Sequence, residues 1–123
     1  MCGIAGIVNF NHEPVKQDDV RSMTDRMRAR GPDDDGFFLD GSLGIGMRRL
    51  SIIDVGGGHQ PIANEDRTVW VVLNGEIYNY QEIMASLVAR GHVFRTKSDT
   101  EVIVHAYEEY GVDCLQRFNG MFA

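Results

Sequence analysis

Two short apolar segments, residues 36–39 and 43–47, are joined through Asp40-Gly41, a residue pair that favours the tight turn of a β-hairpin. A hairpin pairs neighbouring strands antiparallel, whereas parallel strands need a crossover of roughly a dozen or more residues. We therefore expect an antiparallel sheet here rather than a doubly wound parallel sheet. Further short strands are predicted at residues 4–10, 50–53 and 68–73, and another strand is predicted to begin at residues 121–123.

Three helices would alternate with these strands, which gives an α+β layered architecture. The first helix carries Val20, Met23 and Met27 at helical spacing and ends before Gly31-Pro32. The other two each begin with a capping box, in which a polar side chain and a glutamate three residues later bond each other's backbone amides. The two pairs are Asn79 with Glu82 and Ser98 with Glu101.

The composition is typical of one soluble globular domain, because 43% of the 123 residues are hydrophobic and 24% are charged. The net charge of −6, without a basic stripe, argues against a nucleic-acid partner. No segment approaches the ~20 consecutive apolar residues that span a membrane, so no membrane association is expected.

The cysteine and histidine content argues against two further kinds of site. Cys2 and Cys114 are too few for a disulfide framework and suit a reducing cytoplasm, where we expect the protein to reside. The histidines lie far apart in the sequence and lack the Cys/His spacing of zinc sites, so we expect no metal site. They are His12, His59, His92 and His105.

Cys2 follows the initiator methionine directly and is the strongest candidate for a catalytic residue. Removal of Met1 would leave a thiol and a free α-amine on the same residue. An α-amine has a pKa of about 7.7–8.0, so an appreciable fraction is neutral near pH 7 and can act as a base. A nucleophile that carries its own base is a known catalytic arrangement. The alternative is a small apolar residue at the start of a strand.

Three other positions have a catalytic and a structural interpretation. Asn74-Gly75 offers an amide and a backbone N–H to a developing oxyanion, but the same pair is also the preferred hairpin turn. Arg49 could bind a carboxylate in a bidentate manner, or lie at the surface on a strand end. Asp99 could pair with a substrate ammonium group, or stabilise the dipole of the following helix.

Taken together, these residues resemble the class II glutamine amidotransferases, which use an N-terminal nucleophile, and above all the glutaminase domain of glutamine-hydrolysing asparagine synthetases. The resemblance covers all 123 residues. The motifs that carry it are Met1-Cys2-Gly3-Ile4-Ala5-Gly6, Arg30-Gly31-Pro32-Asp33, Arg49-Leu50-Ser51-Ile52-Ile53-Asp54, Gln60-Pro61, Asn74-Gly75-Glu76-Ile77-Tyr78-Asn79, Ser98-Asp99-Thr100-Glu101 and Gly120-Met121-Phe122-Ala123.

The resemblance implies that Cys2 attacks the side-chain amide of glutamine and forms a thioester, which water hydrolyses. It gives Asn74 and Gly75 the oxyanion-hole role, in place of the hairpin turn. The residues that it implies for glutamine binding are Arg49, Ile53, Glu76 and Asp99. Neither a metal nor a cofactor is implied for this half-reaction.

The family fold is a four-layer αββα sandwich, and residues 1–123 would be a partial glutamine amidotransferase type 2 domain. The ammonia acceptor would be a synthetase domain that is missing from this chain, and ATP and Mg would be needed only there. The full-length protein would be a homodimer that makes asparagine. Two alternatives remain open: an acceptor other than aspartate, or a truncated, non-catalytic module that binds glutamine.

Overall fold

A computed structural model describes residues 2–50 and 58–123, which fall into two compact units. The first unit contains residues 2–50 and 59–61, and the second contains Gly58 and residues 62–123. Each unit combines helices with antiparallel strands. The expected mixture of helices and antiparallel strands is confirmed in both.

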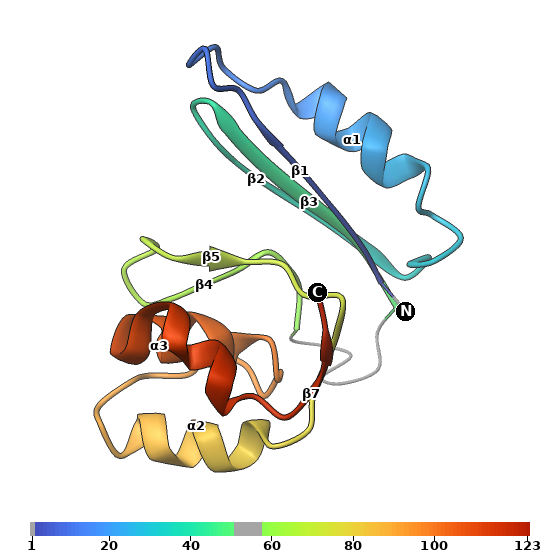
Figure 1. Ribbon diagram of the computed structural model, residues 1–123. Helices are drawn as coiled ribbons and strands as arrows, with labels where there is room; N and C mark the ends of the chain where they lie inside the picture. The colour runs from blue at the N-terminus through green and yellow to red at the C-terminus, as the bar shows by residue number, and fades with distance from the viewer. Residues whose placement is uncertain (1, 51–57) are drawn as a thin grey trace. The chain divides into compact units, whose positions relative to one another are not determined.

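The first unit is a three-stranded antiparallel sheet with one helix against it (Figure 1). The strand order is β1-β3-β2, so the last strand in sequence lies in the centre. The predicted hairpin is confirmed, because Asp40 pairs with Leu43 across the turn. The elements are β1 (Gly3–Val8), α1 (Gln17–Asp25), β2 (Asp34–Asp40) and β3 (Leu43–Arg49).

Helix α1 packs on the sheet through a different set of residues from the one predicted. Val20 is fully buried, but Met23 is 41% exposed, and the residue that is buried beside Val20 is Thr24. The Thr24 hydroxyl donates a hydrogen bond to the Arg21 carbonyl oxygen at 3.0 Å. A polar side chain can occupy this apolar interface because its hydroxyl is satisfied by its own helix.

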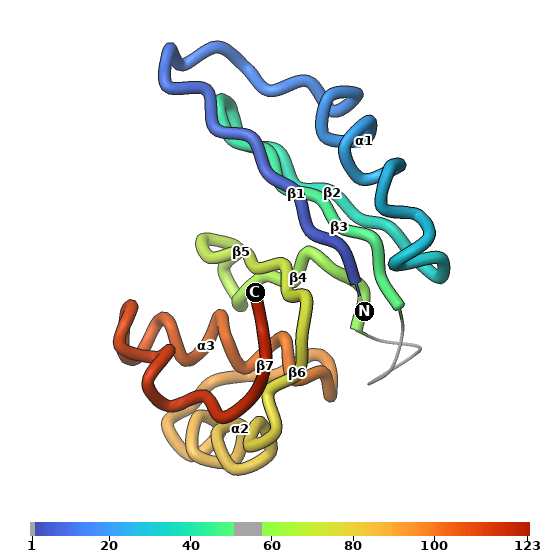
Figure 2. The backbone as a smooth tube through the Cα atoms, turned by 45° about the vertical axis from the view of Figure 1, so that its right-hand side comes forward, coloured from blue at the N-terminus to red at the C-terminus, as the bar shows by residue number. Residues whose placement is uncertain are grey.

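The second unit contains two small antiparallel sheets and two α-helices (Figure 2). Strand β4 pairs with β5, and β6 pairs with β7. Only Trp70 and Val71 of the predicted strand 68–73 lie in a sheet, while the predicted strand at the end of the chain is present. The elements are β4 (Ile62–Ala63), β5 (Trp70–Val71), β6 (Gly75–Ile77), α2 (Tyr80–Val88), α3 (Glu101–Tyr110), the 3-10 helix η1 (Gly111–Arg117) and β7 (Gly120–Phe122).

Both predicted capping boxes are wrong, because neither helix start has a side-chain cap. Asn79 precedes α2, but its Nδ2 donates to the Arg117 carbonyl and its Oδ1 accepts the Asn119 N–H, each at 2.9 Å. Helix α3 begins at Glu101 itself, three residues after Ser98. Contacts with distant residues therefore use the polar groups of Asn79, whereas the Ser98 hydroxyl accepts the nearby Thr100 N–H at 3.2 Å and the Glu101 carboxylate accepts the N–H groups of Arg95 and Thr96.

The core of the second unit is formed by Leu87 of α2, Ala106 of α3 and Cys114 of η1. Cys114 is a core thiol, since this residue is 2% exposed and burial raises the pKa of its thiol. Partly buried side chains pack around this core: Ile83, Phe94, Tyr110 and Phe118. Across residues 2–50 and 58–123, none of the helices is both long and apolar enough to cross a membrane.

Candidate functional site

Cys2 lies at the start of β1, at the end of the sheet where β3 finishes. Its Sγ is 3.3 Å from the Leu50 backbone nitrogen, which donates a hydrogen bond to it. The Cys2 carbonyl accepts a bond from Arg30 Nε at 3.2 Å. The thiol is partly buried, and its position is fixed from both sides by the segments that follow β3 and α1.

Arg49 is the last residue of β3 and is 5% exposed, so the alternative of a surface arginine is wrong. Its carbonyl accepts the Asp33 N–H at 3.1 Å. Gly31 packs directly on this strand end, where an added Cβ would lie 2.6 Å from the Arg49 backbone nitrogen and closer still to the Arg48 carbonyl. The loop after α1 can approach the strand this closely only because residue 31 has no side chain.

Asn74 and Gly75 do not form a hairpin turn, so the structural interpretation of this pair is wrong. They begin the pairing of β6 with β7: Asn74 and Ala123 exchange two backbone hydrogen bonds of 2.9 Å, and Gly75 lies opposite Phe122. Gly75 has a φ of +156°, and an added Cβ would lie 2.8 Å from the Phe122 Cβ. Close approach of β7 therefore requires glycine at this position.

The register of this pair determines where the Gly75 N–H points. Backbone groups in an antiparallel pair point alternately toward and away from the partner strand. Since Asn74 bonds to β7, the N–H groups of Gly75 and Ile77 point to the opposite edge of β6. Asp99 lies at that edge, because its Oδ2 accepts the Ile77 N–H at 2.9 Å.

Asp99 is 4% exposed and lies two residues before the start of α3. One carboxylate oxygen bonds to β6, and the other is 3.4 Å from the Ser98 hydroxyl. The Asn74 Oδ1 is also buried and has no hydrogen-bond partner among the described residues. This edge of β6 therefore brings together an amide, a backbone N–H and a buried carboxylate.

The structure thus gathers the predicted site residues within each unit. The first unit holds Cys2 and Arg49 at one end of its sheet, and the second holds Asn74-Gly75, Glu76 and Asp99 at or next to β6. Glu76 is half-buried and lies opposite Met121 in β7. Ile53 lies outside the described residues.

The family described as "Glutamine amidotransferase domain" matches residues 1–123. The chain belongs to this family. It is 45% identical over 128 residues to asparagine synthetase [glutamine-hydrolyzing] 1 of Bacillus subtilis, with 100% of this chain and 20% of that protein covered. It is 46% identical over 127 residues to enzyme 2 of the same organism, with 100% of this chain and 17% of that protein covered. It is 43% identical over 124 residues to asparagine synthetase [glutamine-hydrolyzing] 1 of Arabidopsis thaliana, with 100% of this chain and 21% of that protein covered.

This glutamine amidotransferase domain therefore spans about a fifth of the length of the curated relatives it matches. The relatives are similar to it along its whole length, so the recognition of the family from its sequence motifs is confirmed.

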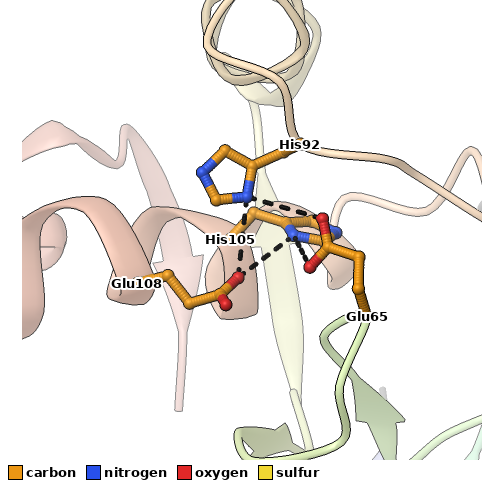
Figure 3. Close-up of side chains that lie close together, drawn as sticks. All are labelled: Glu65, His92, His105 and Glu108. Atoms are coloured by element: carbon orange, nitrogen blue, oxygen red, sulfur yellow. Dashed lines mark ion pairs between the residues drawn. The ribbon is translucent and has the colours of Figure 1, made fainter.

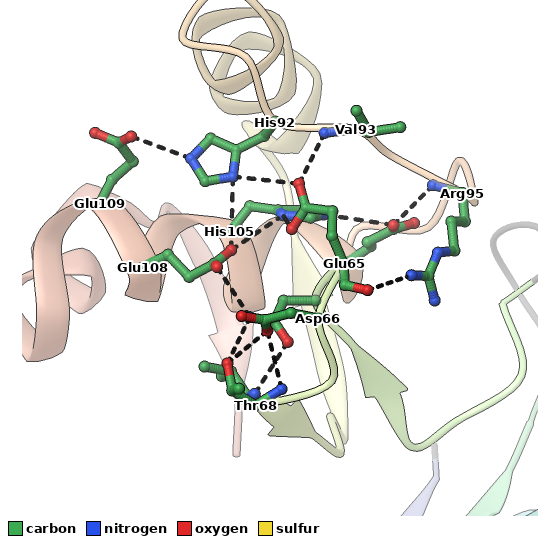
Figure 4. Close-up of polar contacts among 12 residues, drawn as sticks. Glu65, Asp66, Thr68, His92, Val93, Arg95, His105, Glu108 and Glu109 are labelled. Carbon is green, nitrogen blue, oxygen red and sulfur yellow. Dashed lines mark hydrogen bonds and ion pairs between the residues drawn. The ribbon is translucent and has the colours of Figure 1, made fainter.

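The amidotransferase domain also contains a polar cluster that sequence reasoning missed (Figure 4). Its members come from three segments that are far apart in the chain: the turn after β4, the segment after α2, and α3. The one local signal was the spacing of three between two of them, which places both on one face of a helix. The residues are Glu65, His92, His105 and Glu108.

Glu101 anchors a loop to α3 beside this cluster. Its carboxylate accepts the backbone N–H groups of Arg95 and Thr96 at 2.8 and 2.7 Å and the Thr96 hydroxyl at 2.6 Å. Burial alone would raise the pKa of this carboxyl, but hydrogen bonds with His105, Thr96 and Arg95 lower it to about 2. Glu101 is therefore a charged, buried anchor for residues 95 and 96.

Proposed function

We propose that this domain hydrolyses glutamine, with Cys2 as the nucleophile after removal of Met1. The observation that carries the proposal is that the Cys2 thiol and the buried Arg49 share one end of the β1–β3 pair. A nucleophile and a buried arginine at the same end of a strand pair suit a substrate that carries both a reactive carbonyl and a carboxylate. Relatives named as glutamine-hydrolysing support the same activity.

In the first step the Cys2 thiol loses its proton to its own α-amine, and the sulfur attacks the side-chain amide carbon of glutamine. The negative charge that develops on the amide oxygen is stabilised by the Asn74 side-chain amide and the Gly75 N–H. The orientation of this N–H, away from β7, leaves it outside the β6–β7 ladder. One such donor contributes about 2.7–4 kcal/mol to stabilisation of the transition state.

Collapse of this intermediate breaks the carbon–nitrogen bond, and the protonated α-amine returns its proton to the departing ammonia. The product on the enzyme is a γ-glutamyl thioester. Water then attacks the thioester and releases glutamate and the free thiol. Every proton transfer in this scheme uses groups of Cys2 or water.

Substrate selection follows from two opposite charges. In this proposal Arg49 binds the α-carboxylate of glutamine, Asp99 with Glu76 binds the α-ammonium group, and Ile53 is a further glutamine-binding residue. Arg49 and Asp99 are 5% and 4% exposed, so solvent screens their charges little. A ligand that carries both complementary charges therefore binds better than one that lacks either of them.

We further propose that the ammonia passes to a synthetase domain, as the names of the relatives imply, and that ATP and Mg act only there. The glutaminase domain would be a four-layer αββα sandwich in a cytoplasmic, homodimeric enzyme. The packing of α1 on the sheet of the first unit is compatible with one helix layer and one sheet layer of such a sandwich.

The test is covalent labelling of the purified chain with a diazo-ketone that mimics glutamine, followed by intact-mass measurement and peptide mapping. We expect loss of Met1 and one adduct on Cys2, which excess glutamine prevents. Cys114→Ala is the matched control and should be labelled like the original chain, because Cys114 is a buried core thiol. A folded chain that retains Met1, or that is labelled equally after Cys2→Ala, would contradict the proposal.

A further inference from the structure

Four side chains in the second unit converge on one point (Figure 3). One potential ligand atom from each of Glu65, His92, His105 and Glu108 lies within 4.8 Å of all the others. The Nδ1 atom of His92 is 3.6 Å from a carboxylate oxygen of Glu65 and 3.6 Å from one of Glu108. The Nδ1 atom of His105 is 3.2 and 3.5 Å from oxygens of the same two residues.

These four distances are long for direct hydrogen bonds between charged groups, which are about 2.7–2.9 Å. Shorter bonds form close by, where Glu101 accepts from Thr96 at 2.6 and 2.7 Å. In a tetrahedral zinc site, metal–ligand distances of about 2.0–2.2 Å place neighbouring ligand atoms about 3.3–3.6 Å apart. The four separations of 3.2–3.6 Å, two of which run to different oxygens of Glu65, are similar to these ligand–ligand distances, and one ligand atom from each of the four residues lies within 4.8 Å of the others.

The His105 Nδ1 atom provides independent evidence for a ligand. The His105 side chain is 1% exposed, and this nitrogen is buried with no hydrogen-bond partner among the described residues. A buried polar atom without a partner is costly and calls for an explanation such as a bound ion. The atom faces the two carboxylates, as Figure 3 shows.

The Nε2 atom of each histidine contacts a further carboxylate outside this set of four residues (Figure 4). His92 Nε2 is 3.1 Å from Glu109 Oε1, and His105 Nε2 is 3.5 Å from Glu101 Oε1. Histidines that bind metals characteristically donate this second N–H to a carboxylate, which fixes the ring and leaves the other nitrogen free for the metal. Both rings therefore have the orientation of metal ligands.

We propose that Glu65, His92, His105 and Glu108 bind one Zn²⁺ ion in a closed, tetrahedral, structural site. Two imidazole nitrogens favour zinc over magnesium or calcium, which prefer oxygen ligands. The two carboxylates would neutralise the charge of the ion. The ion would tie the turn after β4 and the segment after α2 to helix α3. The site is separate from the residues assigned to glutamine hydrolysis.

Zinc titration of the chelator-treated 123-residue chain, in competition with a chromophoric chelator, tests the proposal. We expect one zinc per chain, and a loss of affinity of more than about 100-fold in His92→Gln and in Glu108→Gln. Glu109→Gln should lower the affinity by roughly 10–100-fold, because Glu109 only orients a ligand. His59→Gln is the matched control, since this exposed histidine also pairs with a carboxylate, Asp34, but lies in the other unit.

Cobalt substitution of the unaltered chain gives a measurement that does not depend on any variant folding. Tetrahedral Co²⁺ should produce intense visible absorption bands, whereas six-coordinate Co²⁺ gives weak ones. The proposal is overturned by weak bands, by the absence of stoichiometric zinc, or by equal zinc affinity in the unaltered chain and His92→Gln. In each of those cases the cluster is a set of direct contacts between histidines and carboxylates without an ion.

Discussion

At Asn74 and Arg49, the two proposed roles should separate in steady-state kinetics. Asn74→Ala should lower kcat by roughly 10²–10³-fold, because its amide would act only on the charge of the transition state. Arg49→Ala should mainly raise KM, because the guanidinium would bind the carboxylate equally in the ground state and the transition state. Ammonia release at varied glutamine concentration measures both constants. Arg28→Ala, which removes an exposed arginine, is the control for Arg49.

The assignment would be wrong if Asn74→Ala changed KM alone, or if both variants lost activity only in proportion to lost folded protein. Circular dichroism of each variant measures the folded fraction and so separates loss of folded protein from a change in kcat or KM.

At Gly75, the prediction concerns stability. Gly75→Ala should be about 1–3 kcal/mol more destabilising than Gly111→Ala, because its Cβ would collide with the backbone of β7. Gly111 also has a positive φ, +57°, with ψ −143°, but open space around it, so alanine there incurs only backbone strain of roughly 1–3 kcal/mol. Urea unfolding of the two variants measures the difference. An equal loss of stability in the two variants would mean that β7 moves to accommodate the added methyl group, which would contradict the prediction.

At the scale of elements, Glu101 holds the loop before α3 in place. Glu101→Gln should lower the free energy of unfolding by about 1–3 kcal/mol, since a neutral amide cannot satisfy both the Arg95 and Thr96 N–H groups. Glu82→Gln, at the exposed first turn of α2, should change it by less than about 0.5 kcal/mol. Urea unfolding measures both variants, and similar values for the two would contradict the anchoring role.

The elements also show what a sequence can predict. The Asp40-Gly41 hairpin was predictable because the turn residues and both strands are adjacent in the chain. Asn74-Gly75 is the same kind of pair, yet its backbone pairs with β7 more than forty residues later. Asn79 likewise bonds to Arg117 and Asn119 instead of capping α2. The residue types correctly indicated that Asn74-Gly75 and Asn79 have a structural or functional role. Contacts with residues far away in the sequence nevertheless determine their conformation.

Local sequence patterns likewise predicted the candidate site only in part. The chemistry proposed for Cys2 followed from its position behind Met1, but the roles proposed for Asn74 and Asp99 came from a family resemblance of ordered motifs, because their local patterns also have a structural interpretation. The cluster of His92 and His105 had no such family signal, and its three segments meet only in the folded unit. Burial of Arg49 also could not be inferred from its neighbours in sequence.

At the scale of the whole molecule, protection from hydrogen exchange should differ strongly between sheets. Strand β3 is paired on both sides, whereas β6 and β7, within residues 2–50 and 58–123, pair with each other alone. Two-stranded sheets are marginally stable by themselves. We expect the amides of β3 to exchange most slowly and those of β7 to exchange much faster. Exchange measured by mass spectrometry or NMR tests this order, and equal protection of β7 and β3 would contradict it.

The packing of Gly31 against the end of β3 has a consequence for the evolution of this chain. Every missense change in its codon adds a side chain, and each such side chain would push against the backbone that carries Arg49. In a deep mutational scan, position 31 should therefore tolerate glycine alone, although it lies in a loop where variation is usually permitted. A library designer who wants to vary this loop must leave that single codon untouched.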